Sequence, residues 1–421
     1  PPARGQPGPR RRTEGVSARA TTGRPDPAGR YAGLPKAHLH VHLEAAMRES
    51  TLREFCAEDR IEVPPLVEYA DFTAFLDAYG LLIGLLRTPE RVERLLDEVV
   101  ADAAAQGVVA LEYASIPEKA AAFDSAEAAL EFILPAAVAA GRRHGVWTGA
   151  IVSIDRGAGP EHALAAARLA ARFADRGVVA VGLVADERGS PVAAAAEAFG
   201  IARDAGLGVV PHAGELAGPE EVRSAIELGV DRIQHGVRAV EDPRVVELLA
   251  ERGICLDVCP TSNVVLGVVP ALEDHPLPTL LDAGVRCSLN ADDPLLFGVD
   301  VVDEYVLAGE RMGVPGARLV DCARTSIECS FAPAGRGSPP GRRPRRAARR
   351  RCGRRSGRRN SGCRRRRRRR SATRGTRGRR PGGGGRAAPR THRGPRRRRP
   401  SRGRGRVRRR GRAGARVRGT A

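Results

Sequence analysis

The sequence predicts an α/β protein built as a (β/α)8 (TIM) barrel, with extra helices after the first strand and a disordered basic segment at each end. Eight short apolar segments alternate with segments of helical length, and polar side chains gather where the apolar segments end. A chain of 421 residues is long enough for one large barrel. A doubly wound open sheet is the competing fold, because it is built from the same β–α units.

The strands are predicted from runs that are apolar almost throughout and do not alternate cleanly with polar residues. This pattern is typical of a parallel sheet that is buried on both faces. The predicted strands, in chain order, are Lys36–Leu43, Gly107–Ala114, Thr148–Ile154, Val178–Val184, Gly208–His212, Asp231–His235, Ile254–Val258 and Val285–Asn290.

The helices are predicted between these strands from segments rich in Ala, Leu, Glu and Arg. The clearest is Pro89–Gln106, which has Thr88 as N-cap, proline in the first helical position and Gly107 just past its end. The insert Met47–Arg87 is expected to form the extra helices over one end of the barrel. The remaining predicted helices are Glu161–Arg176, Val192–Ala205, Pro219–Leu228, Pro243–Arg252 and Val302–Met312.

The net charge of +22 is distributed very unevenly along the chain. Residues 331–421 contain 39 arginines and no lysine, aspartate or glutamate, whereas residues 31–330 have a net charge of −22. We therefore divide the chain into a disordered leader rich in Pro, Arg and Gly (1–30), a barrel domain (31–333) and a disordered arginine-rich tail (334–421). The overall charge consequently says little about the substrate of the barrel.

The arginine-rich tail permits three interpretations. It could be an arm that binds RNA through phosphate contacts, a solvated tail without a role, or the product of a GC-rich gene read in a shifted frame. The third is favoured, because the tail consists almost entirely of residues with GC-rich codons and has neither lysines nor stacking aromatics. In that case the chain is expected to fold poorly or to be an inactive copy.

Two general features bear on the location of the protein. No run of about 18 apolar residues occurs, and no apolar segment follows the arginines near the N-terminus, so neither a membrane helix nor a secretory signal is expected. Most of the eight cysteines lie in apolar runs, which is typical of reduced, buried thiols. We expect a cytoplasmic protein with no membrane partner.

The first strand carries the most informative polar pattern. It contains His38, His40 and His42, followed by Glu44, and strict alternation would place the three imidazoles on one face. In a barrel this face is the interior, and the last residues lie at the carboxyl mouth, where active sites form. Two such histidines can bind one divalent metal ion; the alternative is a set of hydrogen-bonded core histidines.

Three further predicted strands end on similar groups. They supply His212 with Glu215, then His235, then Asp292 with Asp293. Imidazole and carboxylate ligands from separate strand ends suit Zn²⁺ or, less specifically, Fe²⁺ or Mn²⁺. The glutamate, His235 and the second aspartate would then act as acid and base around a metal-activated water molecule. His144, His162 and His275 are expected at the surface or at helix ends, and Asp155 and Arg156 either line the mouth or form an ion pair.

These motifs together resemble the adenosine deaminase family of metal-dependent hydrolases. The resemblance covers about residues 31–333 and runs in order through Pro35–Glu44, His212–Glu215, His235–Gly236, Cys259–Asn263, Ser288–Pro294 and Ser330–Pro333. It implies a (β/α)8 barrel, one zinc ion per subunit, and hydrolysis of a C–N bond in a cyclic amidine, which converts adenosine to inosine and ammonia.

The resemblance also implies roles for individual residues. Those expected to bind zinc are His40, His42, His212 and Asp292. Glu215 would protonate the purine ring, His235 would accept a proton from the attacking water or orient it, and Asp293 would bind both the purine and the hydroxide. Glu44 lies where the family contacts ribose, and His38 matches no ligand position.

Several departures from the family pattern leave the substrate open. Ala45 and Ala185 stand where the family usually has glycine, Gln234 replaces another glycine, and the second strand lacks an arginine. The extra methyl groups of Ala45 and Ala185, both expected where the backbone approaches the substrate, would crowd adenosine or indicate a different substrate pose. Adenine or a modified adenine nucleoside is therefore an alternative substrate. Two further hypotheses are a related hydrolase that acts on a non-purine amine and a protein that binds RNA through the tail.

Overall fold

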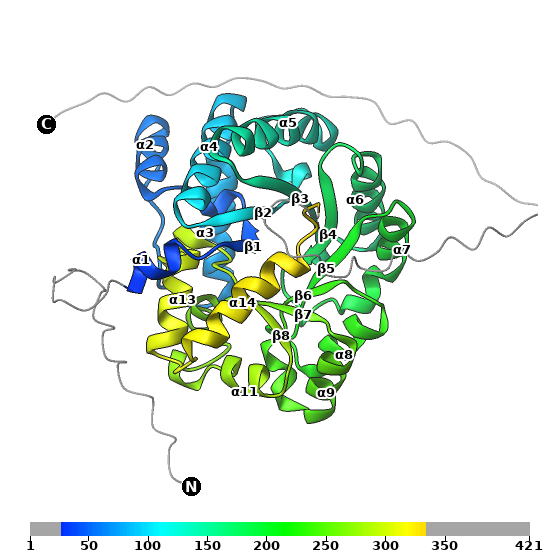
Figure 1. Ribbon diagram of the computed structural model, residues 1–421. Helices are drawn as coiled ribbons and strands as arrows, with labels where there is room; N and C mark the ends of the chain where they lie inside the picture. Colours follow the sequence, from blue (N-terminus) through cyan, green and yellow to red (C-terminus); the bar gives the residue numbers. More distant parts are fainter. Residues whose placement is uncertain (1–26, 334–421) are drawn as a thin grey trace, which may run out of the picture. The chain divides into compact units, whose positions relative to one another are not determined.

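The computed structural model describes residues 27–333, which form a (β/α)8 barrel (Figure 1). Each strand is hydrogen-bonded in parallel to the next, in the order β1 to β8. The strands are β1 Lys36–His42, β2 Val108–Ser115, β3 Trp147–Asp155, β4 Val178–Val184, β5 Gly208–Ala213, β6 Arg232–His235, β7 Cys255–Val258 and β8 Arg286–Leu289. All eight predicted strands are confirmed to within two residues at each end, and the open-sheet alternative is wrong.

The barrel closes where the chain segment after β8 meets β1. The amide of His42 donates to the carbonyl of Asp292 over 2.9 Å, and the amide of Asp292 donates to the carbonyl of His40 over 3.1 Å. The side-chain oxygen of Asn290 accepts hydrogen bonds from two successive amides of β1, those of Leu39 (2.7 Å) and His40 (3.2 Å). We refer to these contacts as the β8–β1 seam.

The helices surround the strands as the sequence predicts, with two long helices, α5 and α14, outside the predicted ranges. Helix α5 was not predicted, because Pro135 and its many alanines obscure the helical pattern of its sequence. The insert after β1 forms α2 and α3, confirming the expected extra helices. The helices are α1 Pro27–Ala32, α2 Glu49–Asp59, α3 Phe72–Leu85, α4 Pro89–Ala105, α5 Ala126–His144, α6 Pro160–Arg172, α7 Ala196–Asp204, α8 Pro219–Glu227, α9 Pro243–Arg252, α10 Pro260–Val265, α11 Leu277–Asp282, α12 Pro294–Phe297, α13 Val301–Glu310 and α14 Gly316–Cys329.

Helix α4 has the ends that its sequence predicts. The Thr88 hydroxyl accepts the amide of Arg91, Pro89 occupies the first turn, and Gly107 follows in the left-handed region with φ of +74°. The first described helix, α1, begins four residues before the expected domain boundary at Tyr31, whose ring packs on that of Tyr305. The rest of the predicted leader and the whole predicted tail lie outside the described residues.

Two further expectations can be checked within residues 27–333. None of the helices there is long and apolar enough to cross a membrane. The six cysteines in this range are free thiols, and all but Cys329 are buried. The remaining two cysteines lie in the tail.

A buried charge cluster occupies the barrel interior near the last helix. The Arg232 guanidinium donates to Glu112 over 2.6 Å and to Asp257 over 2.9 Å, and all three side chains are fully buried. It also donates to the carbonyl of Cys329 and lies 4.7 Å from the ring centre of Phe331. The residues after α14, a helix that packs on β1 and β8 (Figure 1), are thus held to the barrel by this arginine.

We expect Arg232→Met to lower the free energy of unfolding by about 3–5 kcal/mol, because two buried carboxylates lose their counter-charge. Denaturant unfolding of the metal-free protein measures this loss. Arg286, which pairs with Glu328 at the surface, provides the matched control, and Arg286→Met should cost less than about 1 kcal/mol. Equal losses in the two variants would contradict the structural role of Arg232.

Candidate metal and catalytic site

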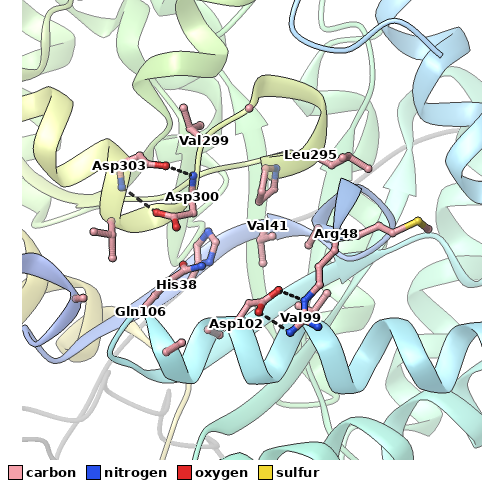
Figure 2. Close-up of a pocket in the computed structure, with 18 of the residues that line it drawn as sticks. His38, Val41, Arg48, Val99, Asp102, Gln106, Leu295, Val299, Asp300 and Asp303 are labelled. Atoms are coloured by element: carbon pink, nitrogen blue, oxygen red, sulfur yellow. Dashed lines mark hydrogen bonds and ion pairs between the residues drawn. The ribbon is translucent and has the colours of Figure 1, made fainter. Parts of the chain in front are cut away.

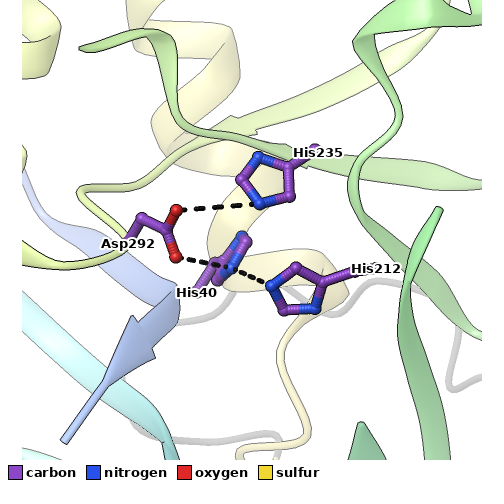
Figure 3. A group of neighbouring side chains, drawn as sticks. All are labelled: His40, His212, His235 and Asp292. Atoms are coloured by element: carbon purple, nitrogen blue, oxygen red, sulfur yellow. Dashed lines mark hydrogen bonds and ion pairs between the residues drawn. The ribbon is translucent and has the colours of Figure 1, made fainter. Parts of the chain in front are cut away.

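Four side chains from separate strands converge at the carboxyl end of the barrel (Figure 3). The Nε2 atom of His40 lies 3.2 Å from Nε2 of His212 and 3.0 Å from Oδ1 of Asp292. The Nε2 atom of His235 lies 3.7 Å from the other oxygen of that aspartate. The ligand atoms of the four residues face one another (Figure 3). Because all four residues are buried, these atoms have little access to bulk water.

His42 lies at the edge of this group. Its Nε2 atom is 3.3 Å from Oδ1 of Asp292, and together with Asp293 they form a second, overlapping group of possible ligands. The structure therefore brings all four residues predicted to bind metal around one carboxylate. It also adds His235 as a fifth neighbour, which the sequence pattern assigned to catalysis.

The donor atoms fit a metal ion. The Nδ1 atom of His40 lies 3.2 Å from the carbonyl of Asp257, which can only accept, so Nδ1 carries the hydrogen and Nε2 presents a lone pair. Oδ1 of Asp292 is buried and receives no hydrogen bond within the described chain. The distances of 3.0–3.3 Å between these donor atoms are close to the distance of about 3.3 Å between neighbouring ligand atoms in a tetrahedral zinc site.

The carboxyl groups of the site differ in charge. Burial alone would raise the pKa of Asp292, but the nearby rings of His40 and His42 hold it well below the usual range, so this group stays ionised. Burial, reinforced by Asp292, raises the pKa of both Glu215 and Asp293 well above the ordinary value. The pKa of Asp292 is thus shifted in the opposite direction from the pKa values of its neighbours Glu215 and Asp293.

The loop that carries Glu215 is held by a neighbouring strand end. The buried carboxylate of Glu187 accepts the amides of Gly214, Glu215 and Ala217. Arg156 donates to the carbonyl of His212 over 2.6 Å from the other side. These contacts fix the direction of Glu215, although the sequence pattern assigned Glu187 no role.

Three residues of the site have left-handed backbone conformations that L side chains rarely adopt. They are Ala185 with φ of +77°, His235 with +63° and Asp292 with +59°. Each lies at or shortly after the carboxyl end of a strand. Such strain persists only where surrounding contacts impose it, as the seam does for Asp292.

A cavity of about 940 Å³ opens over these residues. One wall is the apolar face of α3, with Phe72, Phe75 and Tyr79, and the opposite wall follows β3 and β4. Asp155 and Arg156 both line it, but Asp155 pairs with Lys119 over 2.8 Å rather than with Arg156.

The predicted substrate residues lie at different distances from this cavity. Ala185 and Asp293 line it, together with His42, His212, Glu215, His235 and Asp292. Glu44 is not among the lining residues; it lies behind Tyr79 and accepts its hydroxyl hydrogen bond over 2.9 Å. The expectation that Ala45 crowds the substrate is wrong, because this residue is buried in the hydrophobic core and does not line the cavity.

His38 does not share a face with His40 and His42, contrary to the prediction from strict alternation. The pairing of β1 with β2 shifts between His38 and Val41, where two successive amides bind Asn290, so the strand bulges and its side-chain parity reverses. His38 instead lines a cavity of about 680 Å³ beside Val41, Val99 and Leu295 (Figure 2). Its Nε2 atom accepts the amide of Ala291, next to the seam.

Three residues that support the site were not identified from the sequence. The Ser262 hydroxyl donates to Oδ2 of Asp292 over 2.8 Å, and the Asn263 amide lies 3.2 Å from Nδ1 of His235. His275, expected near the surface, is 3% exposed and contacts Asn263. The run Thr261–Asn263 was a signal for the first two, but His275 lies in an irregular segment without any pattern. His144 and His162 lie on helices as expected, paired with Asp97 and Glu118.

The chain is similar in sequence to known deaminases. The family model described as "Adenosine deaminase" matches residues 35–338. An adenine deaminase of Streptomyces coelicolor is 37% identical over 308 residues, covering 71% of this chain and 90% of the relative. An aminodeoxyfutalosine deaminase of the same organism is 38% identical over 315 residues, covering 72% and 81%. Nearly equal similarity to two different deaminases leaves the substrate undecided.

Solved structures give the same fold. Adenine deaminase from Arthrobacter aurescens matches with a TM-score of 0.67 and 29% identity, over 72% of this chain and 95% of that one. An amidohydrolase from Burkholderia ambifaria with bound zinc matches with 0.65 and 27%, over 73% and 88%. The N6-mAMP deaminase of Arabidopsis matches with 0.66 and 25%, over 73% and 96%.

Replacing Ala185 by glycine should stabilise the fold, since glycine adopts positive φ without steric cost. We expect Ala185→Gly to raise the free energy of unfolding by about 0.5–1 kcal/mol, the released strain being partly offset by the more flexible unfolded chain. Ala180, buried within β4, the strand that ends just before Ala185, is the control, and Ala180→Gly should lower the free energy of unfolding by about 1 kcal/mol. Denaturant unfolding with chelator present measures both, and destabilisation by Ala185→Gly would contradict the strain at this position.

Proposed function

The chain belongs to the adenosine deaminase family, and on this premise we propose that it is a zinc-dependent enzyme that deaminates an uncharged adenine nucleoside, adenosine first of all. Membership supports a metal-dependent hydrolytic deaminase; the choice of zinc, the residue roles and the substrate are our proposals. The observation that carries them is the convergence of four histidine rings, those of His40, His42, His212 and His235, around the buried carboxylate of Asp292, beside Glu215, whose pKa burial raises.

We assign the metal ligands as His40, His42, His212 and Asp292. The hydrogen bond from His40 to the carbonyl of Asp257, and that from Ser262 to Asp292, orient the first and last of these ligands. A zinc ion bound there would supply a water molecule of lowered pKa for attack on the ring carbon that bears the amino group.

The remaining groups bind and protonate the purine. Glu215, a carboxylic acid that faces His235 over 3.6 Å, donates a proton to the ring nitrogen next to the attacked carbon. Asp293, also protonated, donates a hydrogen bond to the base, while His235 contacts the attacking oxygen. Water adds to the carbon; one of its hydrogens passes to the amino group, which leaves as ammonia, and the other replaces the proton that Glu215 gave to the ring nitrogen.

The charge of the cavity favours an uncharged substrate. Within the described chain, its only cationic lining residues are Lys119, which Asp155 already neutralises, and Arg156, which is bound to backbone carbonyls. A phosphate group would therefore meet no free cation among these residues, in contrast to the nucleotide named for the Arabidopsis structure. A volume of about 940 Å³ exceeds the needs of a bare purine, which is why we place adenosine before adenine.

The remaining sequence predictions about activity concern parts that the structure does not describe. RNA binding by the tail, the shifted reading frame and the resulting inactivity all fall on residues outside 27–333. Cytoplasmic location remains a prediction.

Adenosine turnover by the metal-loaded protein tests the function. We expect adenosine to lose its ultraviolet absorbance as inosine forms, adenine to react more slowly, and AMP to react at least about tenfold more slowly, since phosphate is not paired with a free cation of the cavity. A chelator should abolish the activity and zinc should restore it. If none of the three compounds is deaminated by zinc-loaded protein, the proposal is wrong; faster reaction of AMP would overturn the substrate assignment alone.

Glu215→Gln tests the proposed acid. The amide cannot deliver a proton, so we expect kcat for adenosine to fall by about 10²–10⁴-fold while the zinc content stays at the wild-type level. The matched control is Glu220→Gln in the first turn of α8, because Glu220 is exposed and should leave kcat unchanged. Activity of Glu215→Gln within about threefold of wild type would remove this residue from the chemistry.

A further inference from the structure

A chain of hydrogen bonds reaches His235 from behind the site. The amide of Leu277, at the start of α11, lies 3.1 Å from Nδ1 of His275. Nε2 of the same ring lies 3.2 Å from Oδ1 of Asn263, and Nδ2 of this asparagine lies 3.2 Å from Nδ1 of His235. The chain thus links α11, α10 and the end of β6.

The direction of every bond in this chain is determined by its first member. A backbone N–H can only donate, so Nδ1 of His275 accepts and, in a neutral ring, Nε2 carries the hydrogen. That hydrogen is donated to the oxygen of Asn263, which leaves the asparagine NH2 group to donate onward. Nδ1 of His235 must then accept, so the hydrogen of its neutral ring sits on Nε2.

The surroundings keep this direction fixed. His275 is 3% exposed, and burial lowers its pKa to about 4, so its ring is neutral at physiological pH. Asn263 is fully buried, and its backbone N–H donates to the carbonyl of Cys259 over 3.1 Å. Rotation of the asparagine amide would place two hydrogen donors, or two acceptors, against each other.

We propose that Asn263 and His275 are positioning residues that hold His235 as the Nε2–H tautomer, so that it presents a hydrogen-bond donor to the reacting oxygen. Nε2 points between Oε1 of Glu215, 3.6 Å away, and Oδ2 of Asp292, 3.7 Å away. A ring nitrogen that carries a hydrogen presents no lone pair to a metal ion, which supports our assignment of His42 rather than His235 as the fourth ligand. The inference rests on the proposed function only in identifying the reacting oxygen as that of the attacking water molecule.

The test reads the position of the proton directly. Long-range ¹H–¹⁵N spectra of the zinc-free, ¹⁵N-histidine-labelled full chain distinguish the two tautomers of a ring, and His235→Gln identifies the signals of this residue. We expect the wild-type spectrum to show His235 with hydrogen on Nε2 and a lone pair on Nδ1. Hydrogen on Nδ1 in the wild type would overturn the proposal, whatever the variants do.

Asn263→Asp reverses the chain. An aspartate of nearly the same shape can accept from His275 but cannot donate to His235, so Nδ1 of His235 should gain a proton in the spectrum. In zinc-loaded protein we expect kcat for adenosine to fall by about 10²–10⁴-fold with KM within about threefold, the order of loss that a wrong histidine tautomer causes. An Asn263→Asp spectrum identical to that of the wild type would contradict the positioning role.

His275→Gln serves as the conservative rescue. Its amide can accept from Leu277 and donate to Asn263, so both the His235 tautomer and kcat should stay close to wild type. His162→Gln, on a helix outside the barrel, controls for loss of a histidine as such. If no purine is deaminated but the wild-type and Asn263→Asp spectra are as expected, the proposed function fails and the positioning chain stands.

Discussion

Closure of the barrel between β8 and β1 is the constraint on which the site depends. Three successive residues after β8 bind β1: Asn290 through its side chain, and Ala291 and Asp292 through their backbones. The last of them, Asp292, also supplies the carboxylate of the candidate metal site. Because Asp292 exchanges backbone hydrogen bonds with His40 and His42, its carboxylate can only lie beside their imidazoles. The left-handed backbone at Asp292 is the strain that this arrangement imposes. Barrel closure and metal-site assembly are therefore one event.

Burial of charge at both ends of the barrel follows one principle: a charge removed from water is either paired or neutralised by a proton. At the closed end Arg232 lies between Glu112 and Asp257, and the carbonyl of this aspartate also orients His40. At the carboxyl end of the barrel the histidines lower the pKa of Asp292, while burial raises the pKa of both Glu215 and Asp293. Neighbouring carboxyl groups of this site therefore differ in the direction of their pKa shifts.

Much of the fold and most of the site could be predicted from residue patterns. Continuous apolar runs located every strand, and the histidine and aspartate residues at their ends proved to be neighbours because parallel strands all end at the same rim of a barrel. Helix α5 escaped because a proline within it hides the helical signal. His38 was placed on the wrong face because a bulge in β1 depends on the side chain of Asn290, whose partner Leu39 is 251 residues away in sequence.

By itself, the sequence determined the barrel, the residues that converge at its carboxyl end and the resemblance to a deaminase family, since all three depend on local periodicity and on the order of short motifs. Only the tertiary structure decided that His235 lies beside Asp292 together with His40 and His42, which buried carboxyl groups have raised pKa values, and that Asn263 links His275 to His235. These properties depend on burial and on hydrogen bonds between segments that are distant in the chain. Residue types and spacings do not determine either of them.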